Sequence, residues 1–489
     1  MANNIAAVIP IVLAMLLAGG LAGCGGDDDS SPGDTSGSES PEAPDAPSEP
    51  QAPEDPQEPE TLEPSEPDDK PSATSLIIRR DVLIEADIWD PEPKIYSANL
   101  AAVGMVGVPG MSMDDLARSE QLSRMAGGNW NRVSGANPTL DSYTSSPTPE
   151  DVEGIAGYPI EYGDGLPIVF SWPMLPSTVH PGDFLFTLSD GSQVKPQMAA
   201  LAPNYDYNER STVVVFGKFG NRGAAGTPGA VYPVRLEVVD DGTPLQLVGP
   251  GPRFVNAVGM SVAAGTAYGD PDAAPENRAG PRLVAAKLTR MSNIGDIAPP
   301  FYGVASPNDG VTLYGDLAQY RLRVYTSGGF SPDGVRGMQP TDFSRHFRLH
   351  VGNQVLTETG VPYEIGDGTI TVIGLAELGQ AQATYDDTYV EDQDNQIDIV
   401  LAGDEGAIRR ITAVEVPSLP PYFPVYNPGG PGNDPTSGVS YTAPSPPHTQ
   451  PVWIALDEPS TVTYVAPGLE HLQDVKEQLA RLKAASPAK

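Results

Sequence analysis

The fold class is decided by one stretch of sequence, residues 166–174, which reads LPIVFSWPM. Its first five residues are apolar, and turn-forming Ser and Pro follow them. A short apolar run that contains β-branched and aromatic residues and ends at turn residues predicts a buried β-strand.

Similar short runs recur along the chain, each bounded by Gly, Pro, Asn or Asp. They occupy residues 75–89, 211–216, 231–239, 283–288, 320–325, 369–373 and 397–401. Helix signals are few. A short helix is predicted over 112–125, and a terminal helix is predicted from Leu469 onward. Strands therefore do not alternate with long helices, and we expect a mostly β protein built of sandwiches, with a C-terminal helix.

The order of motifs after the first strand carries a resemblance. FSWPM at 170–174 is followed by STV at 177–179, PGDF at 181–184 and STVVV at 211–215. This order resembles the bacterial Ig-like domains of surface-layer and adhesive proteins, although Trp172 replaces the usual acidic residue. The resemblance implies an Ig-like β-sandwich over residues 161–250. PTDF at 340–343 is either the start of a second copy or a chance likeness.

The N-terminus carries a second resemblance. An uncharged apolar run over residues 5–21 leads into LAGC at 21–24, which resembles the lipobox of bacterial lipoproteins. The run has the length of a signal peptide's apolar region. The resemblance implies cleavage before Cys24 and acylation of its thiol, with lipid holding the protein to a membrane. The alternative is an uncleaved N-terminal membrane helix, and the absence of Lys or Arg from residues 1–4 departs from the family.

Two further details concern the anchor. In the lipoprotein family, Asp after the acylated Cys marks retention in the inner membrane, and Gly25 stands there in this chain. We therefore expect the outer membrane in a Gram-negative cell. Cys24 is also the only cysteine, so no internal disulfide can form and the fold must rest on burial of apolar surface.

Residues 27–75 differ sharply in composition from the rest of the chain. They hold sixteen acidic residues and one lysine among repeated Pro-Glu and Pro-Asp units, with almost no apolar residues. Such a segment cannot bury enough surface to offset the entropy of ordering, and Pro and like charges extend it. We expect residues 24–75 to be a disordered spacer.

Charge limits the possible partners. The net charge is −36 for the whole chain, and about −21 of it lies outside the spacer. This argues against nucleic acid as a partner, because phosphate binding needs clustered Lys and Arg. Partners are expected to be the membrane, through the lipid, and a polysaccharide or protein of the envelope or the extracellular space.

The division of the chain follows from these signals. We expect a signal peptide at 1–23, the lipid-bearing spacer at 24–75, and a β region with a short helix at 76–160. An Ig-like sandwich is expected at 161–250. A second β-rich region, which could form a second sandwich, is expected at 251–415. Residues 416–489 are expected to form a Pro/Gly-rich loop, a strand and the terminal helix.

The densest acidic patch outside the spacer spans residues 386–405. Within it, Asp392, Asp394, Asn395 and Asp398 offer several oxygens in a short loop, and Ca²⁺ takes six to eight oxygen ligands. The spacing is not that of an EF-hand. The alternative is a half-exposed strand in which the acids share one face and the aliphatic residues share the other. A calcium site at these four residues is therefore one of two interpretations.

Two other kinds of site have candidate residues in the sequence, a zinc site and a sugar-binding site. His346 and His350 have a spacing that suits zinc on a helix, but alternation with Phe347, Leu349 and Val351 favours a strand. The remaining histidines lack a matching ligand pattern. Aromatic residues suited to sugars stand at Trp130 and at Tyr205 and Tyr207, with a Tyr-rich loop at a sandwich edge as the plainer interpretation.

No nucleophile elbow and no phosphate-binding loop occurs in the sequence. Paired carboxylates for glycoside cleavage come from distant positions, so sequence alone cannot select them. We therefore expect a surface or periplasmic lipoprotein with a binding or structural role and no catalysis. The alternative is an extracellular hydrolase acting on polysaccharide, with Ca²⁺ as a possible requirement.

Overall fold

The computed structural model describes residues 78–221, 228–266, 282–296, 310–329, 335, 337–379, 381–389, 391, 394–417 and 447–472. These residues form several antiparallel sheets and few helices, so the prediction of a mostly β protein is confirmed. The lipobox with Cys24, the spacer and Asp392 lie outside the described residues.

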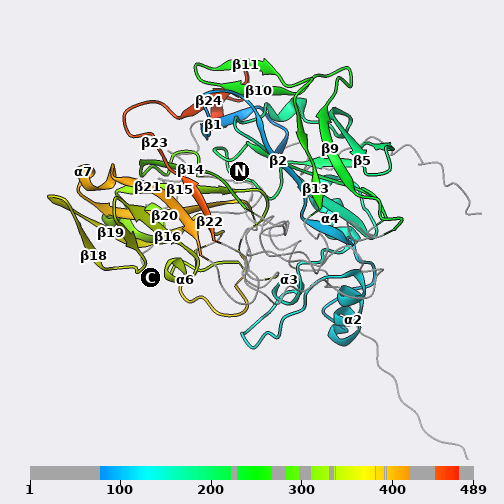
Figure 1. Ribbon diagram of the computed structural model, residues 1–489. Coiled ribbons are helices and arrows are strands. Elements are labelled where there is room, and N and C mark those ends of the chain that lie inside the picture. Colours follow the sequence, from blue (N-terminus) through cyan, green and yellow to red (C-terminus); the bar gives the residue numbers. More distant parts are fainter. Residues whose placement is uncertain are drawn as a thin grey trace, which may run out of the picture. The chain divides into compact units, whose positions relative to one another are not determined.

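A first pair of sheets contains the strand that decided the fold class, β4 (Gly163–Phe170). Its sheet has the order β13 (Gly265–Thr266), β2 (Ile95–Leu100), β4, β8 (Thr212–Gly217), β7 (Met198–Ala200), and β3 (Ala102–Val106) also pairs with β4. The second sheet has the order β12 (Ser261–Ala263), β9 (Pro233–Val238), β5 (Phe184–Leu188), β6 (Gln193–Val194). A hairpin of β10 (Gln246–Gly249) and β11 (Arg253–Asn256) accompanies them (Figure 1).

Alternation explains how these two sheets come to share a core. In β5, Phe184, Phe186 and Leu188 are buried and the residues between them are only half-buried. They join Leu166 and Ile168 of β4 in one hydrophobic cluster. Each fully buried side chain of this size contributes about 1.5–3 kcal/mol. Two sheets packed through one core are the arrangement of a β-sandwich.

Trp172, which departs from the Ig-like pattern, is fully buried at the end of β4. Its indole N–H donates a hydrogen bond to the Asp90 carbonyl (2.8 Å). Gly249 of β10 lies against the ring so closely that a Cβ there would overlap it. A large aromatic residue is tolerated at this position because a glycine faces it.

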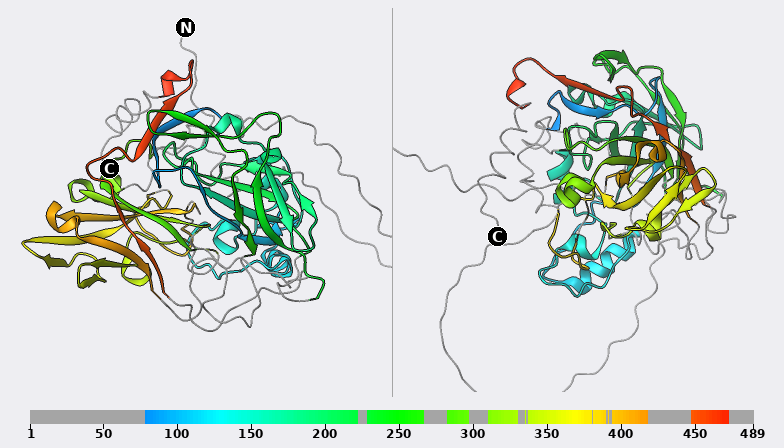
Figure 2. Two further views of the ribbon diagram at one scale, coloured as in Figure 1. Left: turned by 45° about the horizontal axis from the view of Figure 1, so that its top comes forward. Right: turned by 90° about the vertical axis from the view of Figure 1, so that its left-hand side faces the viewer.

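A second pair of sheets lies further along the chain. One has the order β18 (Pro362–Ile365), β19 (Gly368–Ala376), β20 (Gln396–Gly403), β15 (Tyr320–Thr326), β14 (Leu283–Arg290), β23 (Trp453–Ile454). The other has the order β17 (Gln354–Leu356), β16 (Arg348–Val351), β21 (Ile411–Val416), β22 (His448–Pro451). Leu322, Ile399, Leu349 and Val414 are fully buried in one cluster that joins them. Figure 2 shows these strands grouped together in two views.

The remaining strands form a two-stranded sheet, in which β1 (Val82–Asp87) pairs with β24 (Thr461–Val465) across most of the chain's length. The helices are short. They are α2 (Leu116–Ala126), α3 (Leu140–Tyr143), α4 (Pro149–Ala156), α5 (Gly310–Tyr314), α6 (Phe343–His346) and α7 (Glu405–Ile408). Single 3₁₀ turns occur at Pro176–Thr178, Pro181–Asp183, Gly315–Leu317 and Glu470–Leu472. Among the helices of the described residues, none has the length and apolar character needed to cross a membrane.

The predicted short helix is present as α2, which starts later than expected. The Asp115 side chain accepts a hydrogen bond from the Arg118 N–H (3.0 Å) and so caps the helix, and left-handed Gly127 ends it. Asp is a good N-cap because its carboxylate satisfies an otherwise unpaired N–H. Of the predicted terminal helix, only the 3₁₀ turn Glu470–Leu472 falls within the described residues.

Candidate functional site: a buried ion network

A row of charged residues crosses three neighbouring strands of the second pair of sheets. Lys287 of β14 lies opposite Arg323 of β15, and Arg323 lies opposite Asp398 of β20. Side chains alternate between the faces of a strand. These residues therefore share one face, while Leu322 and Ile399 point to the apolar core on the other. The predicted half-exposed strand is wrong in one respect, because Asp398 is only 1% exposed.

Arg323 is the centre of the network. Its Nε and Nη2 donate to the two oxygens of Asp398 at 2.7 and 2.9 Å. Nη2 also donates to Glu377 Oε2 (2.9 Å), and Nη1 donates to Asp87 Oδ2 (3.0 Å). A bidentate arginine–carboxylate pair fixes geometry as well as supplying energy. We call Asp87, Lys287, Asp296, Arg321, Arg323, Glu377 and Asp398 the buried ion network.

Asp87 brings the end of β1 into the network. Lys287 Nζ forms an ion pair with Asp87 and donates to the carbonyls of Ile88 (3.1 Å) and Ser460 (2.9 Å). All three ammonium protons are therefore used. Asp296, in the segment after β14, accepts from Arg321 Nη1 (3.1 Å). The network thus connects β1 with β14, β15 and β20, which lie far from it in sequence.

The pKa shifts follow from burial and pairing. Burial raises the pKa of Glu377 well above its usual value, and the nearby Asp296 carboxylate adds to this. Burial acts to raise the pKa of Asp87 as well, but Lys287 and Arg323 hold it below its usual value. The network holds four carboxylates and three cations. A raised pKa favours the neutral form of Glu377 and so acts against the excess of buried negative charge, which is costly.

Aromatic and hydroxyl contacts flank the charged row. Trp89 stacks on Tyr325 of β15 with ring centroids 4.4 Å apart, and the two lie in a buried cluster with Val169 of β4. Tyr325 Oη hydrogen-bonds to Thr212 Oγ1 of β8 (2.8 Å). The two pairs of sheets are thus joined by apolar packing and a hydrogen bond, whereas the ion pairs of the network join the second pair to β1.

Two further carboxylates converge on Glu377 at the side of the network. Asp206, Glu209 and Glu377 are all buried, and one oxygen from each lies within 4.8 Å of the others. Such a group has the composition of a site for a hard cation. However, Oε2 of Glu377 already accepts from Arg323.

The four residues of the predicted calcium site have different roles in the structure. Asp398 gives both oxygens to Arg323, and Asp394 Oδ1 accepts from the Gln396 N–H (2.8 Å). Asn395 Oδ1 accepts from Asn204 Nδ2 (3.0 Å) and Thr212 Oγ1 (3.1 Å). Asp392 lies outside the described residues. Calcium binding by the loop stays a prediction, with Asp398 engaged elsewhere.

The candidate sugar-binding aromatics also differ from one another. Tyr205 and Tyr207 are 8% and 4% exposed, so they present little ring surface to a ligand. Tyr207 packs with Val82 and Leu472. Trp130 is half-buried and stacks on Tyr143 with centroids 5.3 Å apart. Of the three, Trp130 has the accessible ring.

The two histidines weighed for zinc do not form a pair. His346 ends α6 and is fully buried, whereas His350 lies in β16 and its Nε2 is 2.6 Å from Glu415 Oε2. In β16, Leu349 and Val351 are buried and alternate with half-buried Arg348 and His350, as the strand interpretation predicts, but His346 belongs to α6 and not to that strand. Burial lowers the pKa of His346 to about 3, with help from Arg345 and Arg348.

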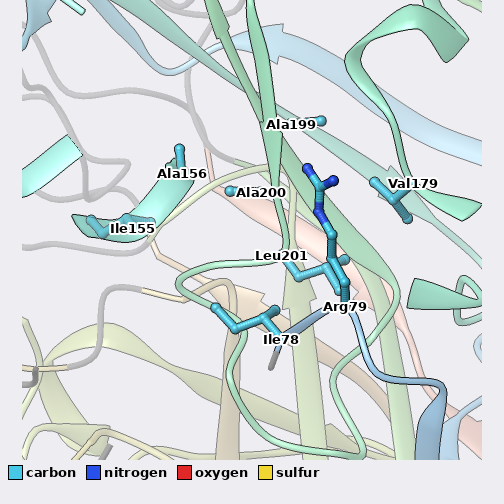
Figure 3. Close-up of a pocket in the computed structure, with 8 residues that line it drawn as sticks. All are labelled: Ile78, Arg79, Ile155, Ala156, Val179, Ala199, Ala200 and Leu201. Carbon is cyan, nitrogen blue, oxygen red and sulfur yellow. The ribbon is translucent and has the colours of Figure 1, made fainter. Parts of the chain in front are cut away.

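One surface hollow lies beside α4 and β7. Its space, including the part open to solvent, is about 280 Å³. It is lined by Ile78, Arg79, Ile155, Ala156, Val179, Ala199, Ala200 and Leu201. Figure 3 shows the Arg79 side chain extending between Ala199 and Val179. The lining contains no carboxylate and no histidine, so it lacks the groups for acid–base catalysis.

Comparison with protein-family models, with curated proteins and with solved structures gives no match to this chain.

The buried ion network was not predicted from the sequence. Asp87 and Arg323 are 236 residues apart, and nothing local marks them as partners. One signal was available: Arg321 and Arg323 alternate with Tyr320, Leu322 and Val324 within a strand. Cations at every second position, with acids on a neighbouring strand, indicate a polar face that pairs across strands.

Proposed function

We propose that this protein is a lipoprotein of the bacterial envelope whose β body has a binding or structural role and no catalytic activity. Acyl chains on Cys24 would hold it to the membrane, with the outer membrane as the location in a Gram-negative cell. The acidic spacer over 24–75 would carry the β body away from the lipid surface. The partner would be a polysaccharide or protein of the envelope.

The observation that carries the non-catalytic role is the pairing of the carboxylates in the buried ion network with its cations. Both oxygens of Asp398 are bound by Arg323, and Asp87 is bound by Lys287 and Arg323. A general acid or base must reach the proton that it transfers. Carboxylates that are buried and saturated by cations cannot do so, and they are suited to fastening sheets together.

An Ig-like identity for residues 161–250 is part of the proposal. It is supported by the motif order from FSWPM to STVVV and by the two sheets that share a core around Phe184 and Ile168. Domains of this architecture present loops at the ends of the sandwich, where binding sites form without a catalytic cleft.

The polysaccharide is the partner that can be tested first, because Trp130 has an accessible aromatic ring. Full-length protein would be incubated with envelope polysaccharides, with and without Ca²⁺, and both retention and release of reducing ends would be measured. We expect retention without release, weakened in Trp130→Ala and unchanged in Trp453→Ala, which removes another half-buried indole. Release of reducing ends would contradict the proposal and favour the hydrolase.

A further inference from the structure

Two turns of the first pair of sheets meet at one place. Strand β5 pairs antiparallel with β9, and Phe184 lies opposite Val238. The 3₁₀ turn Pro181–Asp183 directly precedes β5, and Asp241 follows β9 by three residues. Antiparallel pairing puts the start of one strand beside the end of the other. The turn before β5 and the turn after β9 are therefore neighbours.

This meeting point collects three side chains with metal-ligating atoms. A ring nitrogen of His180 and one oxygen each of Asp183 and Asp241 lie within 4.8 Å of one another. His180 Nδ1 is 3.6 Å from Asp241 Oδ2. The side chains of His180 and Asp241 are 30% and 18% exposed, and Asp183 is fully buried. The group is thus open to solvent on one side and anchored on the other.

The hydrogen bonds of these residues leave specific atoms for a ligand. Asp183 Oδ2 accepts from the His180 N–H (2.7 Å), and Asp241 Oδ1 accepts from the Thr243 N–H (2.8 Å). Asp183 Oδ1 is buried and makes no hydrogen bond, and buried His180 Nδ1 has at most a loose capping contact with the Asp183 N–H. Each carboxylate thus uses one oxygen for a hydrogen bond within its own turn. Leaving the buried Asp183 Oδ1 without a partner is costly, about 1–3 kcal/mol or more for a charged group, and a bound ligand would remove this cost.

Gly182 allows the two turns to approach. A Cβ at this position would lie 2.8 Å from Asp241 Oδ2 and 2.9 Å from its Cβ. Any other residue would push the Asp241 side chain out of the group. Lys195, which directly follows β6, donates a hydrogen bond from Nζ to the Gly182 carbonyl (2.6 Å). This bond helps to hold the turn in place.

We propose that His180, Asp183 and Asp241 form a binding site for a divalent transition-metal ion such as Zn²⁺. The ligand atoms are His180 Nδ1, Asp183 Oδ1 and Asp241 Oδ2, with a fourth position open to solvent. Imidazole with two carboxylates suits zinc and its neighbours better than it suits calcium, which takes oxygen ligands. This site is distinct from the acidic loop at 386–405 and does not depend on the lipid anchor.

The separation of His180 from Asp241 agrees with this assignment. Four ligands at about 2.0–2.2 Å from a tetrahedral zinc ion lie roughly 3.3–3.6 Å from one another. The His180–Asp241 separation of 3.6 Å already meets this value. Two carboxylates also offset the charge of a divalent ion.

The electrostatics of Asp183 point the same way. Burial raises the pKa of Asp183 to about 7, and the nearby Asp241 carboxylate contributes. The N–H groups of His180 and Leu245 and the charge of Lys195 act in the opposite direction without offsetting it. A bound cation would relieve the repulsion between the two carboxylates, because an opposite charge favours the ionised form.

The test is calorimetric titration of the metal-free full-length protein with Zn²⁺. We expect binding with one ion per chain, and a loss of affinity of at least about tenfold in Asp241→Asn and in His180→Gln. Asp240→Asn is the matched control. It changes the adjacent carboxylate of the same turn, whose Oδ1 accepts from the Gly242 N–H (2.9 Å), and it should leave the affinity unchanged.

A second readout separates coordination from an effect on folding. Co²⁺ bound in place of zinc should give a visible absorption spectrum that both site variants lose, while their unfolding temperatures without metal stay close to the parent's. Asp183→Asn should behave likewise, and if that variant does not fold, the other two carry the test. Zinc binding that is absent, or equal in Asp241→Asn and the parent, would overturn the proposal.

Discussion

Arg323 and Asp398 lie directly opposite each other on β15 and β20, and the guanidinium binds both carboxylate oxygens at 2.7 and 2.9 Å. Both side chains are 1% exposed. The strand that carries each of them is apolar on its other face. One sheet therefore packs through hydrophobic residues on one side and through ion pairs on the other.

Replacing Asp398 with Asn should destabilise the protein strongly. Arg323 would keep its charge and lose its bidentate partner, and breaking a buried pair costs about 3–5 kcal/mol. Chemical denaturation would measure the loss. Glu237→Gln is the control, because it removes an exposed partner of Arg235 at 3.4 Å, and such pairs contribute about 1 kcal/mol or less. Equal losses in the two variants would show that the network is not structural.

The stack of Trp89 on Tyr325 should be measurable by a double-mutant cycle. Aromatic pairs contribute about 0.5–1.5 kcal/mol beyond the area that they bury. We expect a coupling free energy in this range between Trp89→Leu and Tyr325→Leu. Tyr325→Phe keeps the ring and removes the hydroxyl's hydrogen bonds to Thr212 (2.8 Å) and to the Phe170 carbonyl (3.4 Å), so it should cost about 1 kcal/mol. A coupling energy of zero would mean that the rings do not interact.

His346 should make the protein less stable in mild acid. Its pKa is about 3 in the folded protein, against about 6.5 in an unfolded chain. Between these values the unfolded chain binds more protons, so stability is lost as the pH falls below 6.5. From about pH 7.5 to about pH 5, we expect a loss near 2 kcal/mol from this residue. His346→Gln should remove that part of the pH dependence, and an unchanged profile would refute the assignment.

Two glycine substitutions should have opposite effects. Gly249→Ala would drive a methyl group into the Trp172 ring, and overpacking of this kind costs about 1–3 kcal/mol. Gly154→Ala meets nothing within 4 Å and lies inside α4, where Ala is favoured over Gly by about 1 kcal/mol. Unfolding temperatures should therefore fall for the first and rise for the second. A rise in the unfolding temperature of Gly249→Ala would contradict the contact between Gly249 and the Trp172 ring.

The strands could be predicted from sequence because their signal is local. Apolar and β-branched residues over 211–216 and 320–325 gave the strands β8 and β15 within about a residue. The start of β1 was placed too early, at residue 75, because alternation in an apolar run does not fix where pairing begins. The pairing of β1 with β24 joins residues nearly four hundred positions apart, and no local pattern predicts it.

The site was less accessible to prediction for the same reason. Asp398 lies in a strand that follows an acidic loop. From the sequence alone, its carboxylate could face solvent, a metal ion or an arginine. Only the register of β15 and β20 selects Arg323. His180 was expected to lack a matching cluster, and this was wrong, because Asp241 reaches it through the pairing of β5 with β9.

The central claim is that lipid on Cys24 anchors a non-catalytic β body to the envelope, and the mass of the mature N-terminal peptide tests it most directly. The protein would be isolated from membranes, digested, and its first peptide analysed by mass spectrometry. We predict a peptide that begins at Cys24 and carries acyl chains, and a Cys24→Ser variant that loses both the modification and the membrane. A peptide that begins upstream of Cys24 with a free thiol would contradict the account.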